Sequence, residues 1–265
     1  MANSASGESV IQRVVKILNA FSKDQPRLSL GELVRATGMS SSTAHRLAND
    51  LVASGLLNRG ATGDYGVGMK MWELAARSNP AEEIRRRGLP FLEGVHAAVR
   101  QQVALAIPDV ESGTVLYVEQ LDQHGTATNL AAVAGRLGIH STSPGLAMMA
   151  HMPHAVQERF LAGPLEKTTP ATETDPARLR AHLALIRERG YVRMTGVLVP
   201  ENTAYAVPVF GEGNSVIGAI SVVLPTVHDD PQLILPVLVA AGRGLSRTMG
   251  AERRPYGTRP WLAAS

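Results

Sequence analysis

The 265 residues include no cysteine, and aromatic residues make up only 4% of the chain. The absence of cysteine excludes disulfide bonds, cysteine-ligated zinc, iron–sulfur clusters and a thiol nucleophile. No apolar run approaches the roughly 20 residues that a membrane-spanning helix needs, because the segment Val216 to Leu224 has only the length of a strand. The opening MANSASG lacks the charged and apolar regions of a signal peptide. We therefore expect a cytoplasmic protein.

Motifs of catalysis and cofactor binding are also missing. The chain contains no G-x-S-x-G nucleophile elbow, no G-x-x-x-x-G-K-[ST] loop and no G-x-G-x-x-G after a strand. The only residues that suggest catalysis are His140, which stands beside two serines, and His151 and His154, which have no acidic ligands nearby in the sequence. We therefore predict no enzyme activity, no cofactor and no metal.

Length and charge favour two domains of different character. A chain of 265 residues with 45% apolar residues is long enough for two hydrophobic cores. Residues 1–79 contain nine Lys/Arg and six Asp/Glu, a net charge of +3, whereas residues 101–250 contain ten and thirteen, a net charge of −3. This distribution suits a DNA-binding head on a near-neutral body.

The segment Leu28 to Leu57 predicts two short helices joined by a tight turn. Ser29 can cap the first helix, and Glu32 three residues later completes a capping box. Gly38 provides the left-handed residue that closes this helix, and Ser40 can cap the second.

The second helix has one buried stripe and one polar face. Apolar residues recur at helical spacing from Ala44 to Val52. The opposite face carries short hydrogen-bonding side chains near the helix N-terminus, which favours phosphate, and an arginine that can reach a base edge. We predict DNA contacts from this face and its start, made by Ser40, Ser41, Ser42, Thr43, His45, Arg46 and Asn49.

After Gly55 the chain reads as a strand, a turn and a returning strand at Tyr65 to Val67. With the two helices this forms a winged helix-turn-helix, in which Arg59 is expected to touch the DNA backbone. The alternative is an ordinary pair of antiparallel helices with a solvated polar face. We predict a winged helix-turn-helix domain at residues 1–68, a linker helix at 69–80, a second domain at 81–250 and a disordered tail at 251–265.

Trp72 in the linker helix admits two interpretations. It can pack against its own head, or it can contact a second copy of the chain, because two heads must be held at a fixed spacing to grip a two-fold operator.

The second domain alternates between helical and strand patterns. Pro90 is expected to start a new helix, Asn129 to Val133 to form a strand, and Pro231 to open the last helix. The strands have no regular βαβ order, so the fold class is α+β on an antiparallel sheet.

Seven segments in order resemble the isocitrate-lyase-regulator (IclR) family of bacterial transcription factors. They are STAHRL at 42–47, GLL at 55–57, YGVGMKMWEL at 65–74, IHSTSPG at 139–145, GY at 190–191, AVPVF at 206–210 and AISV at 219–222. The resemblance covers roughly residues 8 to 248. It implies a winged-helix head, a GAF-like effector-binding domain, a homodimer or a tetramer formed as a dimer of dimers, and a regulator, which we expect to be a repressor.

The resemblance also implies the positions of an effector pocket. They are Ser141, Ser143, Pro144, Gly145, Met194, Ala204, Ala206, Ser221 and Val223. The backbone amides of the 141–145 loop are implied to hold a carboxylate, although Pro144 has no N–H to donate.

Several pocket positions depart from the family pattern. The acidic cluster after Gly190-Tyr191 is replaced by Arg193 to Val197, the family cysteine by Ala204, and a second hydroxyl by Val223. We therefore expect an effector less polar than glyoxylate or pyruvate, either aromatic or lipid-derived. The alternatives are a pocket without a physiological ligand, a ligand-binding module that acts without DNA, and an enzyme of unknown class.

Overall fold

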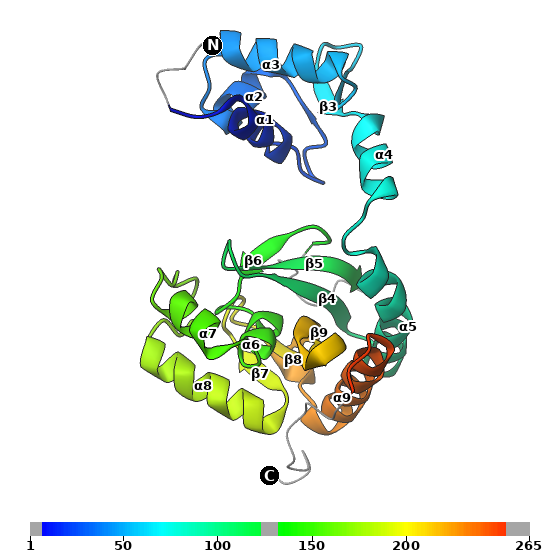
Figure 1. Cartoon of the computed structure of the whole chain (residues 1–265), viewed down its shortest axis with the longest axis vertical. Coiled ribbons are helices and arrows are strands. Elements are labelled where there is room, and N and C mark those ends of the chain that lie inside the picture. The colour runs from blue at the N-terminus through cyan, green and yellow to red at the C-terminus, as the bar shows by residue number, and fades with distance from the viewer. Residues whose placement is uncertain (1–6, 123–131, 253–265) are drawn as a thin grey trace. The chain divides into compact units, whose positions relative to one another are not determined.

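The computed structural model describes residues 7–122 and 132–252 and divides the chain into two compact units, Met1–Pro80 and Ala81–Ser265 (Figure 1). Most of the predicted strand at 129–133 and nearly all of the predicted tail lie outside the described residues. Within the described residues, no helix is long and apolar enough to cross a membrane.

The first unit begins with three helices, each capped by a serine. They are α1 (Val10–Asn19), α2 (Leu30–Thr37) and α3 (Ser41–Ala53), with Ser9, Ser29 and Ser40 as N-caps. The capping box predicted at Ser29 and Glu32 is present, and Gly38 closes α2 with a left-handed φ of 67°. Local sequence signals therefore set both ends of α2.

Three short antiparallel strands complete this unit in the order β1-β3-β2. They are β1 (Arg27–Leu28), β2 (Leu57–Arg59) and β3 (Tyr65–Val67). The predicted hairpin of β2 and β3 is confirmed, while β1 was missed because its two residues are too short to show a period. Tyr65 and the apolar stripes of the three helices form the core.

The linker helix is α4 (Met69–Arg77), which contains no buried residue. The Trp72 side chain is 68% exposed. The interpretation that Trp72 packs against its own head is therefore wrong.

The second unit is built on a six-stranded antiparallel sheet in the order β6-β5-β4-β9-β8-β7. Its strands are β4 (Gln102–Asp109), β5 (Thr114–Leu121), β6 (Arg136–Gly138), β7 (Val192–Thr195), β8 (Asn202–Phe210) and β9 (Val216–Pro225). The α+β class and the antiparallel sheet are confirmed.

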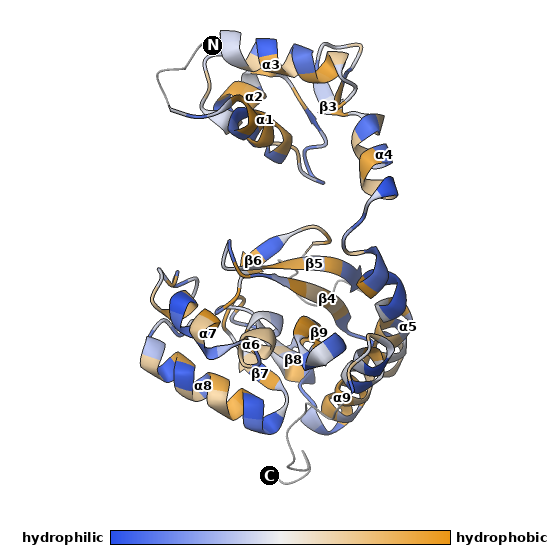
Figure 2. Cartoon of the chain, viewed as in Figure 1, coloured by the Kyte–Doolittle hydropathy of each residue, from blue (hydrophilic) through white to orange (hydrophobic). Residues whose placement is uncertain are grey.

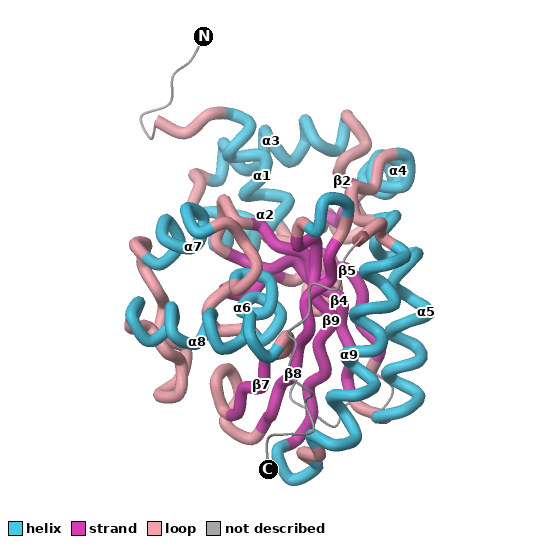
Figure 3. The backbone as a smooth tube through the Cα atoms, turned by 60° about the horizontal axis from the view of Figure 1, so that its bottom comes forward, coloured by secondary structure: helices cyan, strands magenta, loops and turns pink. Residues whose placement is uncertain are grey.

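Two groups of helices cover the two faces of this sheet (Figure 3). One face is covered by α5 (Glu82–Val99) and α9 (Pro231–Thr248), which also pack against each other. The other face is covered by α6 (Ser143–Met149), with α7 (His154–Leu161) and α8 (Pro176–Arg189) around it. Two 3₁₀ turns, Glu212–Asn214 and Thr226–His228, flank β9.

The two faces differ in side-chain size, although the strands are coloured largely hydrophobic throughout (Figure 2). Large residues such as Leu105, Val207 and Ile220 face α5 and α9. Small residues face α6, among them Ala104, Ala106, Ala206 and Ala219. Small side chains allow the short helix α6 to lie close to the sheet.

The prediction that Pro90 starts a new helix is wrong, because α5 continues through it. An interior proline costs about 3 kcal/mol through the lost hydrogen bond and a clash with the preceding turn. The buried residues of α5 form one stripe across the proline, and they are Ile84, Gly88, Leu92, Val95 and Val99. Packing of that whole stripe on one sheet face outweighs the cost.

Candidate DNA interface and effector cavity

The polar face of α3 is presented to solvent as predicted. Ser40, Ser41, Ser42, His45 and Arg46 are exposed, and Thr43 and Asn49 are half-buried. The buried stripe of α3, which includes Leu47 and Leu51, fixes this orientation. Seven predicted DNA-contact residues therefore lie together at the start and along the outer face of one helix.

Ser40 organises the start of α3. Its Oγ accepts a hydrogen bond from the Thr43 N–H at 3.3 Å and donates one to Thr43 Oγ1 at 2.9 Å. The remaining N–H groups of the first turn point along the helix axis, where a phosphate gains from both the free donors and the helix dipole.

Arg46 is held by a weak and reversible contact. Its Nη1 lies 3.2 Å from Asp50 Oδ2, one helical turn away, and its side chain is 60% exposed. An exposed pair of this kind contributes at most a few tenths of a kcal/mol. Arg46 can therefore exchange Asp50 for a base edge or a phosphate at little cost.

Asn49 is tied to the wing. The Tyr65 hydroxyl donates to Asn49 Oδ1 at 3.4 Å, and Asn49 Nδ2 lies 3.2 Å from His45 Nε2. Asn49 therefore links the exposed face of α3 to β3 and orients His45.

The wing is braced by Arg27, which sequence reasoning did not single out. Its guanidinium donates to the Asp64 carboxylate and, at 3.0 Å, to Asn58 Oδ1. The Arg27 hydrogen bond lowers the pKa of Asp64 to about 2. Arg59 is exposed and lies 5.7 Å from the Tyr65 ring centroid, so its charge remains available on the wing.

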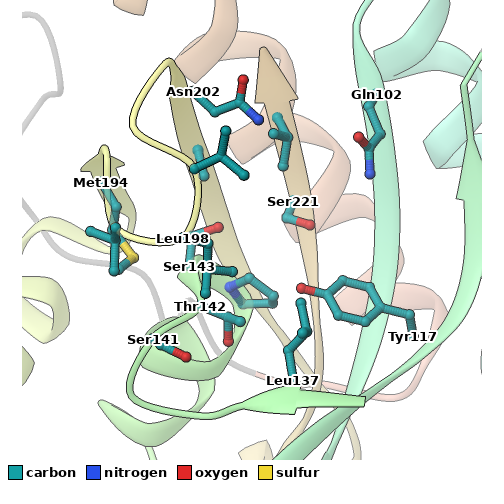
Figure 4. A pocket seen from close by; sticks show the side chains of 15 residues that line it. Gln102, Tyr117, Leu137, Ser141, Thr142, Ser143, Met194, Leu198, Asn202 and Ser221 are labelled. Carbon is teal, nitrogen blue, oxygen red and sulfur yellow. The ribbon is translucent and has the colours of Figure 1, made fainter. Parts of the chain in front are cut away.

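The second unit contains a cavity on the α6 face of the sheet, shown from close by in Figure 4. It measures about 60 Å³ as the space open to the centres of water molecules. Its walls are largely apolar and come from the start of α6, the sheet and the segment after β7. The lining residues are Gln102, Tyr117, Leu137, Ser141, Thr142, Ser143, Pro144, Met194, Val197, Leu198, Val199, Asn202, Ala204, Ser221 and Val223.

Of the nine predicted effector residues, the cavity brings together seven: Ser141, Ser143, Pro144, Met194, Ala204, Ser221 and Val223. Gly145 and Ala206 do not line it. The Gly145 N–H donates to Thr142 Oγ1 at 3.2 Å and is buried within the first turn of α6. Ala206 is fully buried in the core cluster on the α6 face.

The loop before α6 leaves backbone donors available. The amides of Ser141, Thr142 and Ser143 make no hydrogen bond to another described residue. Their side chains are engaged, since Ser141 Oγ and Thr142 Oγ1 donate to the Gly138 carbonyl at 3.3 and 3.0 Å. This loop can therefore hold an anion through backbone N–H groups, as the resemblance implied for a carboxylate.

Sequence reasoning missed several walls of the cavity. Gln102 and Tyr117 lie on β4 and β5, and Val197 to Val199 follow β7. The available signal was a glutamine at the start of an otherwise apolar strand. The segment after β7 has no periodic pattern, so its position over the sheet depends on tertiary contacts.

Two of the histidines considered for the enzyme alternative have different surroundings. His140 Nε2 lies 2.8 Å from the Glu166 carbonyl, and His154 is exposed. Among residues 7–122 and 132–252, no three His, Asp or Glu side chains could hold a metal ion together.

Two family models match the chain and together span nearly all of its described part. Residues 10–60 match the IclR helix-turn-helix domain, and residues 79–247 match the bacterial transcriptional regulator IclR C-terminal domain.

Individual relatives match over similar lengths. The transcriptional regulator XynR of Escherichia coli is 29% identical over 91% of this chain and 96% of its own. An IclR homologue from Microbacterium hydrocarbonoxydans, crystallised with 4-hydroxybenzoate, is 37% identical with a TM-score of 0.83, covering 91% of this chain and 99% of its own. Another from Microbacterium sp. strain HM58-2 is 36% identical with a TM-score of 0.58, covering 93% and 100%.

Proposed function

The chain belongs to the IclR family of bacterial DNA-binding transcriptional regulators, and we propose that it is a repressor whose operator binding is controlled by a small aromatic carboxylic acid. The head supplies the operator contacts, and the cavity in the second unit supplies the effector site. Such a regulator works in the cytoplasm, where the DNA is.

The observation that carries the operator proposal is the exposed face of α3. Ser42, His45 and Arg46 project from a helix whose opposite stripe is buried. Short side chains at its N-terminus let the backbone approach the phosphates, while Arg46 is long enough to reach a guanine edge. Arg59 on the wing adds a contact to the neighbouring backbone.

The dimensions and walls of the cavity support the effector class. At about 10–15 Å³ per water centre, 60 Å³ holds roughly four to six waters, which is the room that a single-ring acid needs. This favours the aromatic alternative over a long lipid chain. The free amides of the 141–143 loop suit the carboxylate, and the apolar walls suit the ring. The bound 4-hydroxybenzoate of the Microbacterium hydrocarbonoxydans relative belongs to this class.

A salt-dependent gel shift tests the operator proposal. The purified protein is mixed with DNA from upstream of its own coding region, with excess competitor, at two salt concentrations. We expect specific retention that weakens steeply with salt, because phosphate contacts release counterions. Arg46→Ala should lose about 1–3 kcal/mol of specific binding.

The matched control is Arg178→Ala, which removes the same charge from an exposed position of the second unit. It should leave operator affinity unchanged. Unchanged affinity in Arg46→Ala would contradict the assignment of Arg46. A folded wild-type protein that binds the acid but selects no site from the whole genome would favour the ligand-binding module that acts without DNA.

A further inference from the structure

Three polar side chains converge on the cavity from neighbouring strands, on the side away from the 141–143 loop (Figure 4). They are Tyr117 on β5, Gln102 on β4 and Ser221 on β9, and they are 5%, 3% and 1% exposed. Polar side chains of this kind are rarely buried on an otherwise apolar sheet face unless they have a partner.

The register of the sheet explains how they meet. Tyr117 is paired with Ala106, and Ser221 with Ala104, so both lie on the same face of the sheet as Gln102. Ala104 and Ala106 of β4 lie between these two side chains, and each carries only a methyl group. This leaves space into which the Tyr117 ring extends from one side and the Ser221 hydroxyl from the other.

The hydroxyls of Tyr117 and Ser221 have no hydrogen-bond partner among the described residues. Other buried hydroxyls of this unit do have one, for example Ser143 Oγ, which donates to the Tyr205 carbonyl at 3.4 Å. Burial raises the pKa of Tyr117, so its phenol stays protonated and remains a donor. A hydroxyl in the interior needs a partner, and the hydroxyls of Tyr117 and Ser221 can find one only in the cavity that both side chains line.

We propose that Tyr117 and Ser221, with Gln102 beside them, recognise a hydroxyl substituent on the effector ring at the end remote from its carboxylate. The inference rests on the proposed aromatic-acid effector and narrows it to hydroxylated acids. The Tyr117 hydroxyl donates to the oxygen of the substituent, and the substituent donates to Ser221 Oγ or to the Gln102 amide oxygen. The unsubstituted acid leaves the hydroxyls of Tyr117 and Ser221 unpaired and binds less tightly.

The test compares ligands that differ by one oxygen atom. Isothermal titration of the full-length protein uses 4-hydroxybenzoate, 3-hydroxybenzoate and benzoate as probes. We expect at least one hydroxylated acid to bind the wild type about tenfold or more tightly than benzoate, because a site built for a hydroxyl rejects the analogue without it. Tyr117→Phe keeps the ring and removes the oxygen, so it should abolish this preference while leaving benzoate binding nearly unchanged.

Two further variants separate recognition from packing. Ser221→Ala should weaken the hydroxylated acid and spare benzoate. Tyr191→Phe is the matched control, since Tyr191 lies at a neighbouring hollow beside α8 rather than at this cavity, and it should preserve the preference.

Failures of the two proposals are distinguishable. If none of the three acids binds the wild type, the effector class is wrong and the recognition of a hydroxyl falls with it. If hydroxylated and plain acids bind equally, or if Tyr117→Phe weakens both to the same degree, the effector class stands and the recognition role of Tyr117 is overturned.

Discussion

His151 is a half-buried titratable group that neither binding site uses. It follows α6, its ring meets Phe210 edge-on at 5.0 Å, and its Nε2 has no partner among the described residues. Burial, with a smaller contribution from the nearby charge of Arg187, lowers its pKa to about 4 from the ordinary value of 6.5. The folded protein therefore keeps His151 neutral at pH values where the unfolded chain protonates it.

This difference predicts a loss of stability in mild acid. Between pH 6.5 and pH 4, His151 is protonated in the unfolded state but not in the native state. The free energy of unfolding therefore falls as the pH is lowered. The cost of one pKa unit is about 1.4 kcal/mol, so His151 alone should remove about 2 kcal/mol between pH 7 and pH 5. Urea unfolding at a series of pH values measures it.

His151→Phe keeps a ring against Phe210 and removes the titration. It should flatten the stability profile between pH 7 and pH 5. The control is His154→Phe, at an exposed position three residues later, which should retain the wild-type slope. A slope that is the same in His151→Phe and in the wild type would show that another group causes the acid sensitivity.

At the scale of elements, the segment Val197 to Val199, which lines the cavity, is held by hydrogen bonds from two threonines of the loop before α8. Thr169 Oγ1 can donate its one proton to the Gly196 carbonyl at 3.1 Å or to the Val197 carbonyl at 2.7 Å, and Thr172 Oγ1 donates to the Val197 carbonyl at 3.0 Å. Thr172 is 3% exposed. The loop before α8 therefore holds Val197 to Val199 against the cavity.

Removal of the hydrogen bonds from Thr169 and Thr172 should speed the dissociation of the effector. The double variant Thr169→Val/Thr172→Val keeps the side-chain shape and removes the donors. Each net hydrogen bond contributes about 0.5–1.5 kcal/mol, so we expect about a tenfold faster dissociation of a bound aromatic acid. Amide exchange of residues 196–201 should rise in parallel. Stopped-flow displacement and hydrogen exchange measure the two effects.

Thr168→Val is the matched control, because Thr168 is exposed and does not contact the segment through a hydrogen bond. It should leave both rates unchanged. If the double variant releases the acid at the wild-type rate while residues 196–201 exchange faster, the segment does not gate the cavity.

Local signals in the sequence predicted elements well where a cap or a glycine defines the end. Ser29 and Gly38 set the two ends of α2, and Pro231 opens α9. These residues set backbone geometry by themselves, so no knowledge of the fold was needed.

Prediction failed where tertiary contacts decide. Pro90 did not end its helix, since packing on the sheet outweighs the local cost. The three-residue strand β6 is too short to show a period. Tyr117 and Gln102 looked like ordinary strand residues, because only the register of three strands brings them to one cavity. The positions that the family resemblance supplied included Ser221 on this wall of the cavity, but not Tyr117 or Gln102 beside it.

At the scale of the whole molecule, the first unit exposes several large apolar side chains on α1 and α4. Ile11 on α1 is exposed, as are Met69, Trp72 and Leu74 on α4. Exposed apolar patches on otherwise polar surfaces mark contacts with partners. A two-fold operator requires two heads at a fixed spacing, and a homodimer through these helices would provide it.

Trp72→Glu tests this dimer at the level of DNA binding. A carboxylate in an apolar contact must be desolvated without a partner, so the variant should bind a two-fold operator about tenfold or more weakly, on the order of 1.4 kcal/mol. Its affinity for an isolated half-site should not change. Light scattering on the eluted protein reports the oligomeric state, and anisotropy titrations with full and half operators report the binding.

Arg77→Glu is the matched control, because it places the same carboxylate on roughly the opposite side of α4 and disrupts only an exposed ion pair with Glu73. It should keep the preference for the full operator. If Trp72→Glu bound the two-fold operator with the wild-type affinity, the spacing of the heads would have to be set by contacts elsewhere in the molecule. Since the α4 side chains are all at least partly exposed, a change at Trp72 leaves the cores of both units intact, and a loss of operator binding then reports on the contact between copies.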